Sequence, residues 1–234
     1  MKIEDITLVI TSCNRFDLLE RTIQSMEPWI HELPYKIIVE DSNSQPELFN
    51  RLRTLDFRII INGRRLGQLP SIDRAYEQLK TEFIFHCEDD WEFSRRPNME
   101  AARQILKEGI DDEGKFSVVC FRETTGTKHS RKGLFRDRTV QGSLFRYSFD
   151  HKYPFNYFSF NPGMLRRDFY ERYGPWSKFK NERSIAQAIM RERRCIAREL
   201  PGIVRHIGKG RSRVRPSKWK WIRELAKNWL VSKI

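Results

Sequence analysis

The alternation of short apolar runs with longer amphipathic segments is the feature that most constrains the fold of this chain. Runs rich in β-branched and aromatic residues, typical of buried strands, occur at residues 6–10, 36–39, 57–61, 83–87 and 117–121. Segments with apolar residues at helical spacing predict helices at 19–30, 71–79 (with Ser71 as N-cap) and 99–108. This order predicts an α/β fold in which a Rossmann-like, mainly parallel sheet carries helices on both faces, in a single domain.

The second half of the chain has a less regular pattern. Residues 122–152 are basic and dotted with glycines, which predicts long loops or an edge ribbon. Helices are predicted at 167–173, closed by Gly174-Pro175, and at 182–193. We expect the folded domain to span residues 1–208 and a basic, tryptophan-containing tail to occupy 209–234.

The charge balance favours anionic partners. The 234 residues include 44 Lys or Arg against 31 Asp or Glu, a net charge of +13, which suits nucleotides, phosphates, nucleic acid or an acidic membrane surface. The first apolar run is too short for a signal sequence or a membrane span, so a cytoplasmic protein is expected. The cysteines have no paired spacing, which argues against a zinc site or a disulfide framework.

Three adjacent carboxylates, Glu88-Asp89-Asp90, follow directly on the apolar run 83–87. Because like charges repel, the triplet needs bulk water, a helix end or a bound cation. In open α/β sheets ligands bind at the carboxyl ends of strands, which is where the triplet is expected. A divalent metal site and a solvated turn that caps the next helix are both compatible with the triplet alone.

Well-known nucleotide-binding motifs do not fit. The glycines between Gly202 and Gly210 lack the spacing and the hydroxyl residue of a Walker A loop, and no Gly-x-Gly-x-x-Gly follows the first strand. Polar groups nevertheless recur at successive strand ends, at 11–15, Asp41, 62–65 and 88–90. Since the ends of neighbouring parallel strands form one crevice, its carboxylates and arginines suit a nucleoside diphosphate joined to a divalent metal.

Four segments of this sequence, at 7–26, 37–44, 62–93 and 160–176, resemble family 2 glycosyltransferases of the GT-A fold. The likeness covers most of residues 5–208, which would then be the catalytic domain. The resemblance implies a set of residues around the donor nucleotide: Thr11, Cys13, Arg15, Asp41 and Arg65.

The resemblance also implies a metal site at the triplet. Asp90 would bind a divalent metal, Mn²⁺ or Mg²⁺, and Asp89 would contact the ribose or support the metal ligands. His206, in a setting similar to that of a family histidine near the domain end, would complete the metal site. A lone histidine also occurs as an ordinary surface or core residue.

Inverting members of the family use a carboxylate at the start of a helix as general base. The matching string here begins Asn181-Glu182, with Asn in place of the first acid and Glu in place of the usual Asp. Glu182 is the predicted base, although a Glu in a first helical turn also stabilises the helix dipole. Residues 161–163 and Trp176 would lie toward the acceptor, and Trp176 also suits a core position.

These observations predict an inverting, metal-dependent glycosyltransferase that moves a sugar, of the hexosyl class, from a nucleotide-sugar donor to a hydroxyl of a glycan or lipid-linked acceptor. A nucleotidyltransferase on a similar sheet and a basic nucleic-acid-binding protein are the alternatives. Seven Lys or Arg between Arg205 and Lys220 precede a predicted amphipathic helix with Trp221 and Trp229. This tail suits either peripheral contact with the inner, anionic face of a membrane or packing on the catalytic domain.

Overall fold

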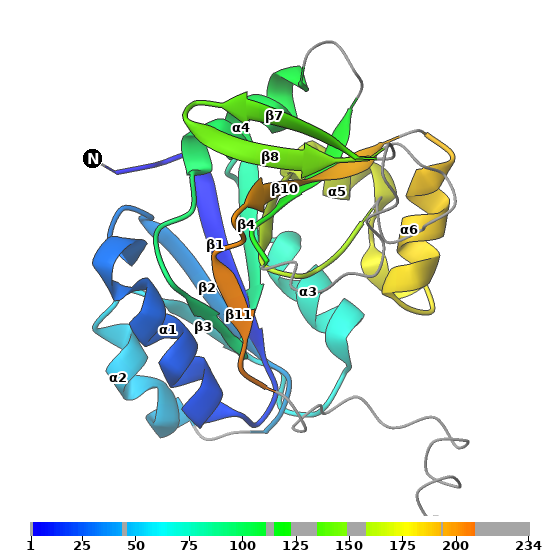
Figure 1. The fold of residues 1–234 in the computed structure, drawn as a ribbon. Coiled ribbons are helices and arrows are strands. Elements are labelled where there is room, and N and C mark those ends of the chain that lie inside the picture. The colour runs from blue at the N-terminus through cyan, green and yellow to red at the C-terminus, as the bar shows by residue number, and fades with distance from the viewer. Residues whose placement is uncertain are drawn as a thin grey trace, which may run out of the picture.

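The computed structural model describes residues 2–43, 46–110, 115–122, 135–148, 158–192 and 194–208. A nine-stranded sheet runs through the molecule in the order β3-β2-β1-β4-β9-β6-β10-β8-β7 (Figure 1). Its strands are β1 Ile6–Ser12, β2 Tyr35–Glu40, β3 Arg58–Ile61, β4 Phe83–Glu88, β6 Phe116–Cys120, β7 Arg136–Val140, β8 Ser143–Tyr147, β9 Gly163–Arg166 and β10 Cys195–Leu200.

Most strands of this sheet run in one direction, as the sequence predicts. The pairs β3-β2, β2-β1, β1-β4 and β6-β10 are parallel. The remaining pairs, which involve β9 or β8, are antiparallel. Only β9 and β8 therefore oppose the common direction among the nine strands, and β9 lies between β4 and β6 in the middle of the sheet.

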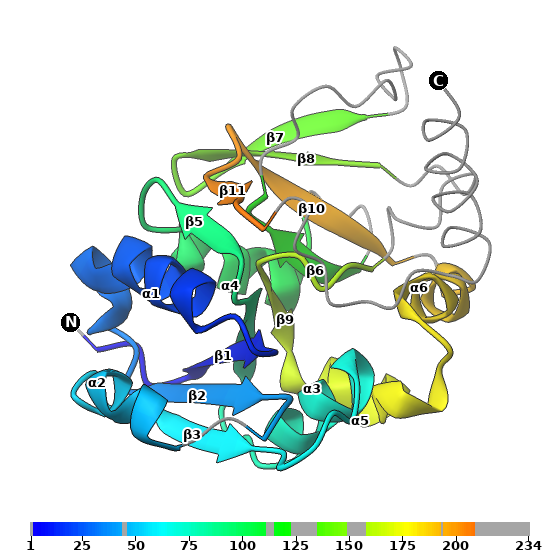
Figure 2. The ribbon, with the colours of Figure 1, turned by 90° about the horizontal axis from the view of Figure 1, so that it is seen from below.

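Helices cover both faces of the sheet (Figure 2). Helices α1 Phe16–Ile30, α2 Asn50–Arg53 and α4 Met99–Glu108 contribute to the hydrophobic core on one face. Helices α3 Gln68–Tyr76, α5 Arg167–Tyr173 and α6 Glu182–Met190 contribute to the core on the other face. Two short 3₁₀ turns, Pro46–Phe49 and Trp176–Lys178, complete the helical layers.

A second, two-stranded sheet lies beside the large one. Strand β5 Trp91–Phe93 follows the carboxylate triplet and pairs antiparallel with β11 Val204–His206. Because β11 comes more than a hundred residues later in the chain, this pairing brings the end of the described chain back to the triplet. The predicted catalytic domain boundary at residue 208 and the tail at 209–234 are not tested, since the tail lies outside the described residues.

Three predicted helices have wrong boundaries. Helix α1 begins at Phe16 and not at residue 19, and helix α3 ends at Tyr76 and not at residue 79. Helix α3 begins at Gln68, because Gly67 at φ +102° is its N-cap, and Ser71 lies inside the helix, where its hydroxyl donates to the Gly67 carbonyl at 2.7 Å. The helix predicted at 182–193 ends at Met190. Within 122–152, the edge-ribbon alternative is confirmed for β7 and β8, whereas residues 123–134 and 149–152 lie outside the described chain.

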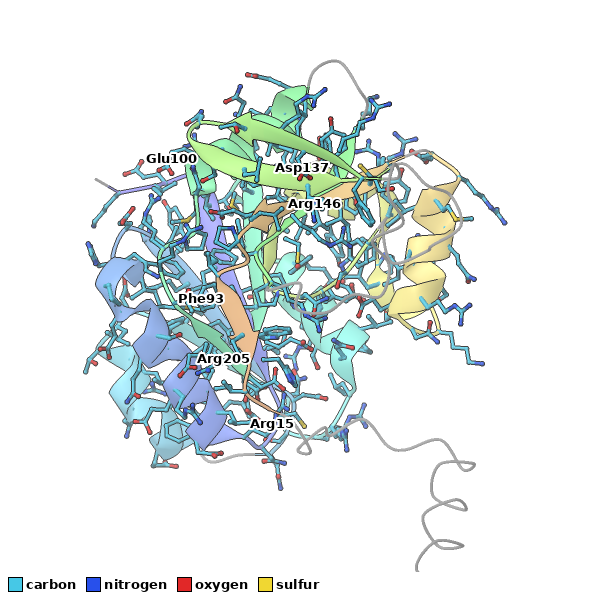
Figure 3. All side chains as sticks on the ribbon, viewed as in Figure 1. Arg15, Phe93, Glu100, Asp137, Arg146 and Arg205 are labelled. Atoms are coloured by element: carbon cyan, nitrogen blue, oxygen red, sulfur yellow. The ribbon has the colours of Figure 1, made fainter. Side chains whose placement is uncertain are left out.

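The hairpin of β7 and β8 is the edge of the sheet. Strand β7 is mostly exposed, and the Arg146 guanidinium on β8 donates to both oxygens of Asp137 on β7, at 2.7 and 2.6 Å. Figure 3 shows these two side chains facing each other on the outside of the hairpin. Exposed ion pairs contribute little to stability, but charged side chains on an edge strand disfavour pairing with another chain.

Trp176 is a core residue and does not face an acceptor. Its side chain is fully buried, with ring centroids 5.2 Å from Phe158 and 5.9 Å from Phe160. Its backbone N–H donates to the buried Asp73 carboxylate at 2.7 Å. The acceptor role predicted for Trp176 is therefore wrong, and the core alternative is confirmed.

We expect Trp176→Ala to lower the free energy of unfolding by about 3 to 5 kcal/mol, because it removes a large buried ring and leaves a cavity. Urea unfolding followed by circular dichroism measures this loss. Trp176→Phe, which keeps an aromatic ring at the same place, is the control and should lose much less. Unfolding of Trp176→Ala at the wild-type urea concentration would contradict the core assignment.

Candidate active site

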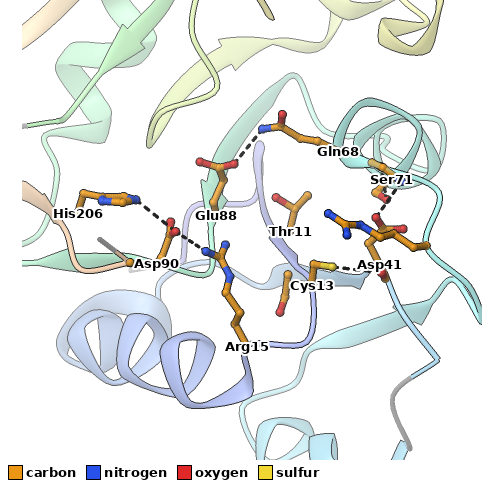
Figure 4. A pocket seen from close by; sticks show the side chains of 13 residues that line it. Thr11, Cys13, Arg15, Asp41, Gln68, Ser71, Glu88, Asp90 and His206 are labelled. Atoms are coloured by element: carbon orange, nitrogen blue, oxygen red, sulfur yellow. Dashed lines mark hydrogen bonds and ion pairs between the residues drawn. The ribbon is translucent and has the colours of Figure 1, made fainter. Parts of the chain in front are cut away.

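A cavity of about 310 Å³ opens at the carboxyl ends of the parallel strands (Figure 4). The backbone ladder continues past the strands, because Asp41 N–H donates to Ser12 O at 2.8 Å and Asp89 N–H donates to Thr11 O at 3.0 Å. Polar side chains that are distant in the sequence therefore line the same cavity. The lining residues are Thr11, Ser12, Cys13, Arg15, Asp41, Arg65, Gly67, Gln68, Ser71, Glu88, Asp90, His206 and Gly208.

The structure brings seven of the sequence-predicted site residues into this lining. These are Thr11, Cys13, Arg15, Asp41, Arg65, Asp90 and His206. Asp89 and Glu182 do not line the cavity. The predicted crevice at neighbouring strand ends is thus present in the structure.

Asp90 is the point where the early and late parts of the chain meet. Its Oδ2 accepts a hydrogen bond from Arg15 Nη1 at 2.7 Å and lies 3.2 Å from His206 Nε2. Strand β11 holds His206 there, since it pairs with Trp91, and Ile207 N–H donates to the Asp90 carbonyl at 2.9 Å. In Figure 4, Asp90 lies between His206 and Arg15.

The residues around Asp90 fit a divalent cation. Asp90 Oδ1 is buried without a hydrogen-bond partner among the described residues, so it has free lone pairs for a ligand. Within the same residues, no three His, Cys, Asp or Glu side chains form a complete metal cluster. The Asp90 carboxylate alone is nevertheless sufficient as a protein ligand, because Mg²⁺ is usually bound by one or two carboxylates together with substrate phosphates and water.

Asp89 holds the Arg15 side chain in place through hydrogen bonds. It is fully buried, and its Oδ2 accepts from Arg15 Nε at 3.1 Å and from the Cys13 backbone N–H at 3.4 Å. Burial raises the pKa of Asp89 to about 6, although Arg15 acts in the opposite direction. In this structure the Asp89 carboxylate orients Arg15 and is not among the residues that line the cavity.

Glu88 accepts hydrogen bonds from two side chains. Gln68 Nε2 donates to Glu88 Oε1 at 2.8 Å, and Trp91 Nε1 donates to Oε2 at 3.4 Å. Burial and the nearby Asp90 charge raise the pKa of Glu88 to about 8.

Asp41 shapes the turn that carries Arg65. Its carboxylate accepts from Asn62 Nδ2 at 2.9 Å, Leu66 N–H at 2.7 Å and Gly67 N–H at 2.8 Å. Burial raises the pKa of Asp41, but these hydrogen bonds outweigh it and hold the pKa below the usual value. Most of its acceptor sites are thus filled by the protein, so Asp41 fixes the shape of this turn.

Cys13 lines the cavity as a neutral thiol. Its Sγ donates to the Asp41 carbonyl at 3.4 Å. Burial raises the pKa of the thiol, and the positive charge of Arg65 only partly opposes this. A thiol with a raised pKa is a poor nucleophile, so Cys13 is part of the cavity wall.

Glu182 occupies the first position of α6 behind the N-cap Asn181, which forms a capping box with Ser184. Burial raises the pKa of Glu182, while the polar groups of Ser159 and Phe160 and the positive charge of Arg122 oppose the rise. The negative charge of Glu182 in turn contributes to the raised pKa of Glu88, so the two carboxylates interact electrostatically.

Sequence reasoning missed the contributions of Gln68, Gly208 and Arg122. Gln68 is hidden because the helix was expected to begin after it. Gly208 was considered only as part of a phosphate-loop string and a turn beside His206, but a Cβ at this position would lie 2.8 Å from Asp90 Cγ. Such close approaches come from the pairing of β11 with β5, which has no local signal in the sequence.

A family model described as "Glycosyl transferase family 2" matches residues 7–174, which is more than two thirds of the chain. The match includes both the strand ends that line the cavity and the carboxylate triplet. This chain therefore belongs to glycosyl transferase family 2. No curated protein matches its sequence.

Solved structures similar to this chain are glycosyltransferases of the GT-A fold. S. aureus TarS 1–349 in complex with UDP-GlcNAc is 11% identical, with a TM-score of 0.57, over 91% of this chain and 62% of that one. GalNAc-T7 with UDP, GalNAc and Mn²⁺ is 12% identical, with a TM-score of 0.58, over 90% of this chain and 45% of that one. The chain thus spans less than two thirds of either, and the likeness establishes the GT-A fold.

None of the helices in the described residues combines the length and the apolar character required to cross a bilayer.

We expect Gly208→Ala to weaken Mn²⁺ binding by about ten- to a hundredfold, because the added Cβ overlaps the Asp90 carboxylate and displaces it from His206. Isothermal titration with Mn²⁺ measures the change. Gly142→Ala, in the β7-β8 turn at φ +78°, is a control for backbone strain and should bind Mn²⁺ as the wild type does. Unchanged binding by Gly208→Ala would show that the close approach of Gly208 to Asp90 has no role.

Proposed function

We propose that this glycosyltransferase is inverting and metal-dependent, and that it transfers a hexosyl group from a nucleotide-sugar to an acceptor hydroxyl. The observation that carries the proposal is the grouping of Asp90, His206 and Arg15 at one end of a polar cavity that Glu88 also lines, with Glu182 interacting electrostatically with Glu88. We infer that this end of the cavity takes a cation and the donor phosphates, and that Glu182 is the base.

The donor side of the proposal rests on charge and chemistry. Arg15 and Arg65 supply positive charge for a diphosphate, and the wall of the cavity offers the hydroxyls of Thr11 and Ser71. The solved structures point in the same direction, since TarS was determined with UDP-GlcNAc and GalNAc-T7 with UDP and Mn²⁺. A nucleoside diphosphate sugar is therefore the proposed donor.

The proposed reaction is a displacement at the anomeric carbon. The acceptor oxygen forms the new bond to this carbon, the bond to the diphosphate oxygen breaks, and its electron pair leaves with the diphosphate. Glu182 takes the proton of the acceptor hydroxyl, a role that suits a carboxylate whose pKa is raised by burial. A bound divalent cation would stabilise the charge that develops on the leaving diphosphate.

The decisive experiment is product analysis with a panel of nucleotide-sugars and Mn²⁺ or Mg²⁺. A glycosyltransferase releases a nucleoside diphosphate, whereas a nucleotidyltransferase attacks phosphorus and does not. NMR of the product gives the anomeric configuration, which is opposite to that of the donor for an inverting enzyme. Retention of configuration would overturn the inverting mechanism and leave the family assignment in place.

We expect Asp90→Asn to abolish metal-dependent turnover and to leave the fold intact, because it removes a charged oxygen ligand without disturbing core packing. Activity at limiting Mn²⁺ measures the loss, and thermal unfolding checks the fold. Near-normal turnover at limiting Mn²⁺ would mean that Asp90 is not a metal ligand.

We expect Glu182→Gln to lower kcat by about a hundredfold or more and to change donor affinity little, as for the loss of a general base. Glu192→Gln is the matched control, since Glu192 follows the same helix and pairs with Arg172 at 3.0 Å. Steady-state kinetics and donor titration separate the two effects. If Glu182→Gln keeps the wild-type rate, the base is another carboxylate.

The acceptor and the surroundings of the enzyme stay predictions. A glycan or a lipid-linked hydroxyl is the proposed acceptor, and the basic tail at 209–234 is the proposed contact with an anionic membrane surface. The tail lies outside the described residues.

A further inference from the structure

Helix α1 packs against strand β5, which begins directly after Asp90 (Figure 2). Among the buried residues of α1, Thr22 is the one that carries a hydroxyl group, and its side chain is fully buried. A β-branched Thr inside a helix is less favourable than Ala or Leu. The presence of Thr22 at this position therefore needs a reason outside the helix itself.

The Thr22 hydroxyl bridges the two residues on either side of Asp90. It donates to the Asp89 carbonyl at 2.9 Å and accepts from the Trp91 backbone N–H at 3.2 Å. A hydroxyl has one proton and two acceptor lone pairs, so both hydrogen bonds can be present together. Because the single proton goes to Asp89, it does not go to a carbonyl of the helix, which is a common partner of a helical Thr. One side chain of α1 thus holds the backbone before and after Asp90.

The turn formed by Asp89 and Asp90 is also held from two other directions. The Asp89 N–H donates to the Thr11 carbonyl at 3.0 Å, and the Asp90 carbonyl accepts from the Ile207 N–H at 2.9 Å. Both of these hydrogen bonds join backbone groups, so a side-chain substitution does not remove them directly. The contact from α1 is made by a side chain, and a substitution of Thr22 can remove it alone.

We propose that Thr22 is a positioning residue for the metal site. Its hydroxyl fixes the turn so that Asp90 Oδ1 faces the divalent cation while Oδ2 stays beside Arg15 and His206. The inference rests on the proposed role of Asp90 as a metal ligand and adds the residue that fixes its backbone. Thr22 itself does not contact the metal, since it is fully buried and is not among the residues that line the cavity.

The loss of this hydroxyl acts on the metal through the backbone. It leaves the Asp89 carbonyl and the Trp91 N–H without the partner on α1, and unpaired buried groups are unfavourable. The turn then shifts toward other partners and carries Asp90 with it. Ligands must be held within about 0.5 Å of their productive position, and loss of a contact behind a metal ligand weakens metal affinity about ten- to a hundredfold.

The test compares two substitutions of Thr22. Thr22→Val keeps the shape of the side chain and removes the hydroxyl, whereas Thr22→Ser keeps the hydroxyl and removes the methyl group. We expect Thr22→Val to bind Mn²⁺ about tenfold more weakly than the wild type and Thr22→Ser to bind it nearly as well. Electron paramagnetic resonance of free Mn²⁺ measures binding, with Mn²⁺ alone and with UDP, below the unfolding temperature of each variant.

Ser25→Ala is the matched control on the same helix. The Ser25 hydroxyl accepts from the Phe93 backbone N–H at 3.0 Å and donates to the Thr22 carbonyl at 2.6 Å. It therefore makes a similar contact to β5, but two residues farther from Asp90. Ser25→Ala should lower the melting temperature and leave Mn²⁺ binding unchanged. An equal loss of Mn²⁺ binding in Ser25→Ala and Thr22→Val would mean that α1 only supports β5 in general, and the specific role of Thr22 would be wrong.

If Thr22→Val does not fold, Thr22→Cys replaces it, because a thiol is a weak donor in place of the hydroxyl. Thr22→Cys should bind Mn²⁺ more weakly than Thr22→Ser, and equal binding by these two variants would overturn the proposal. Wild-type affinity in Thr22→Val, or an equal loss in Thr22→Ser, would also overturn it.

The binding measurement separates this inference from the proposed function. If no sugar transfer is found but Mn²⁺ affinity falls in Thr22→Val and is kept in Thr22→Ser and Ser25→Ala, the proposed function fails and the role of Thr22 stands. If the wild type binds no Mn²⁺, alone or with UDP, the metal site and the role of Thr22 are both wrong.

Discussion

The contact of Arg15 with the carboxylates of Asp89 and Asp90 is the interaction on which the site depends. Two adjacent acids lie almost completely buried at the end of β4, and an unpaired buried charge costs several kcal/mol. Arg15 lies behind the end of β1 and reaches both carboxylates. Two buried acids are therefore tolerated at the end of β4 because the segment that follows the neighbouring strand β1 places the Arg15 guanidinium beside them.

The same contact bears on how Asp90 could interact with a bound cation in place of Arg15. Arg15 and His206 both lie beside Asp90 Oδ2, whereas Oδ1 has no partner among the described residues. Under the proposed function, a cation held at Oδ1 would add positive charge next to Arg15 and would weaken the hold of Arg15 on Asp90. The guanidinium would then be available for the donor phosphates. Arg15 would thus stabilise the site without ligands and contribute to binding when they are present.

Local patterns in the sequence were sufficient to predict the first strands of the sheet and the polar residues at their ends. The strand ends at Thr11, Asp41 and Glu88 could be placed because parallel strands repeat one simple rule, that polar residues follow a buried apolar run. The prediction failed where position depends on distant pairing. The antiparallel strand β9 has no distinctive pattern, and the approach of Gly208 to Asp90 exists only because β11 returns to β5. Trp176 was ambiguous because an aromatic ring suits a core and a sugar face equally well.

The reversed direction of β9 brings a late segment of the sequence to the strand ends formed by the early part. Strands β1 to β5 come from residues 6–93, while Ser159, Asn161 and Glu182 come from residues after 158, as do His206 and Gly208 of the cavity wall. Since β9 runs against its neighbours, the segment that enters it reaches the same edge as the segments that leave β1 and β4. If the proposed donor and acceptor sides are correct, substitutions in that entering segment would alter the acceptor side while the donor side keeps its framework, so the two specificities could diverge independently.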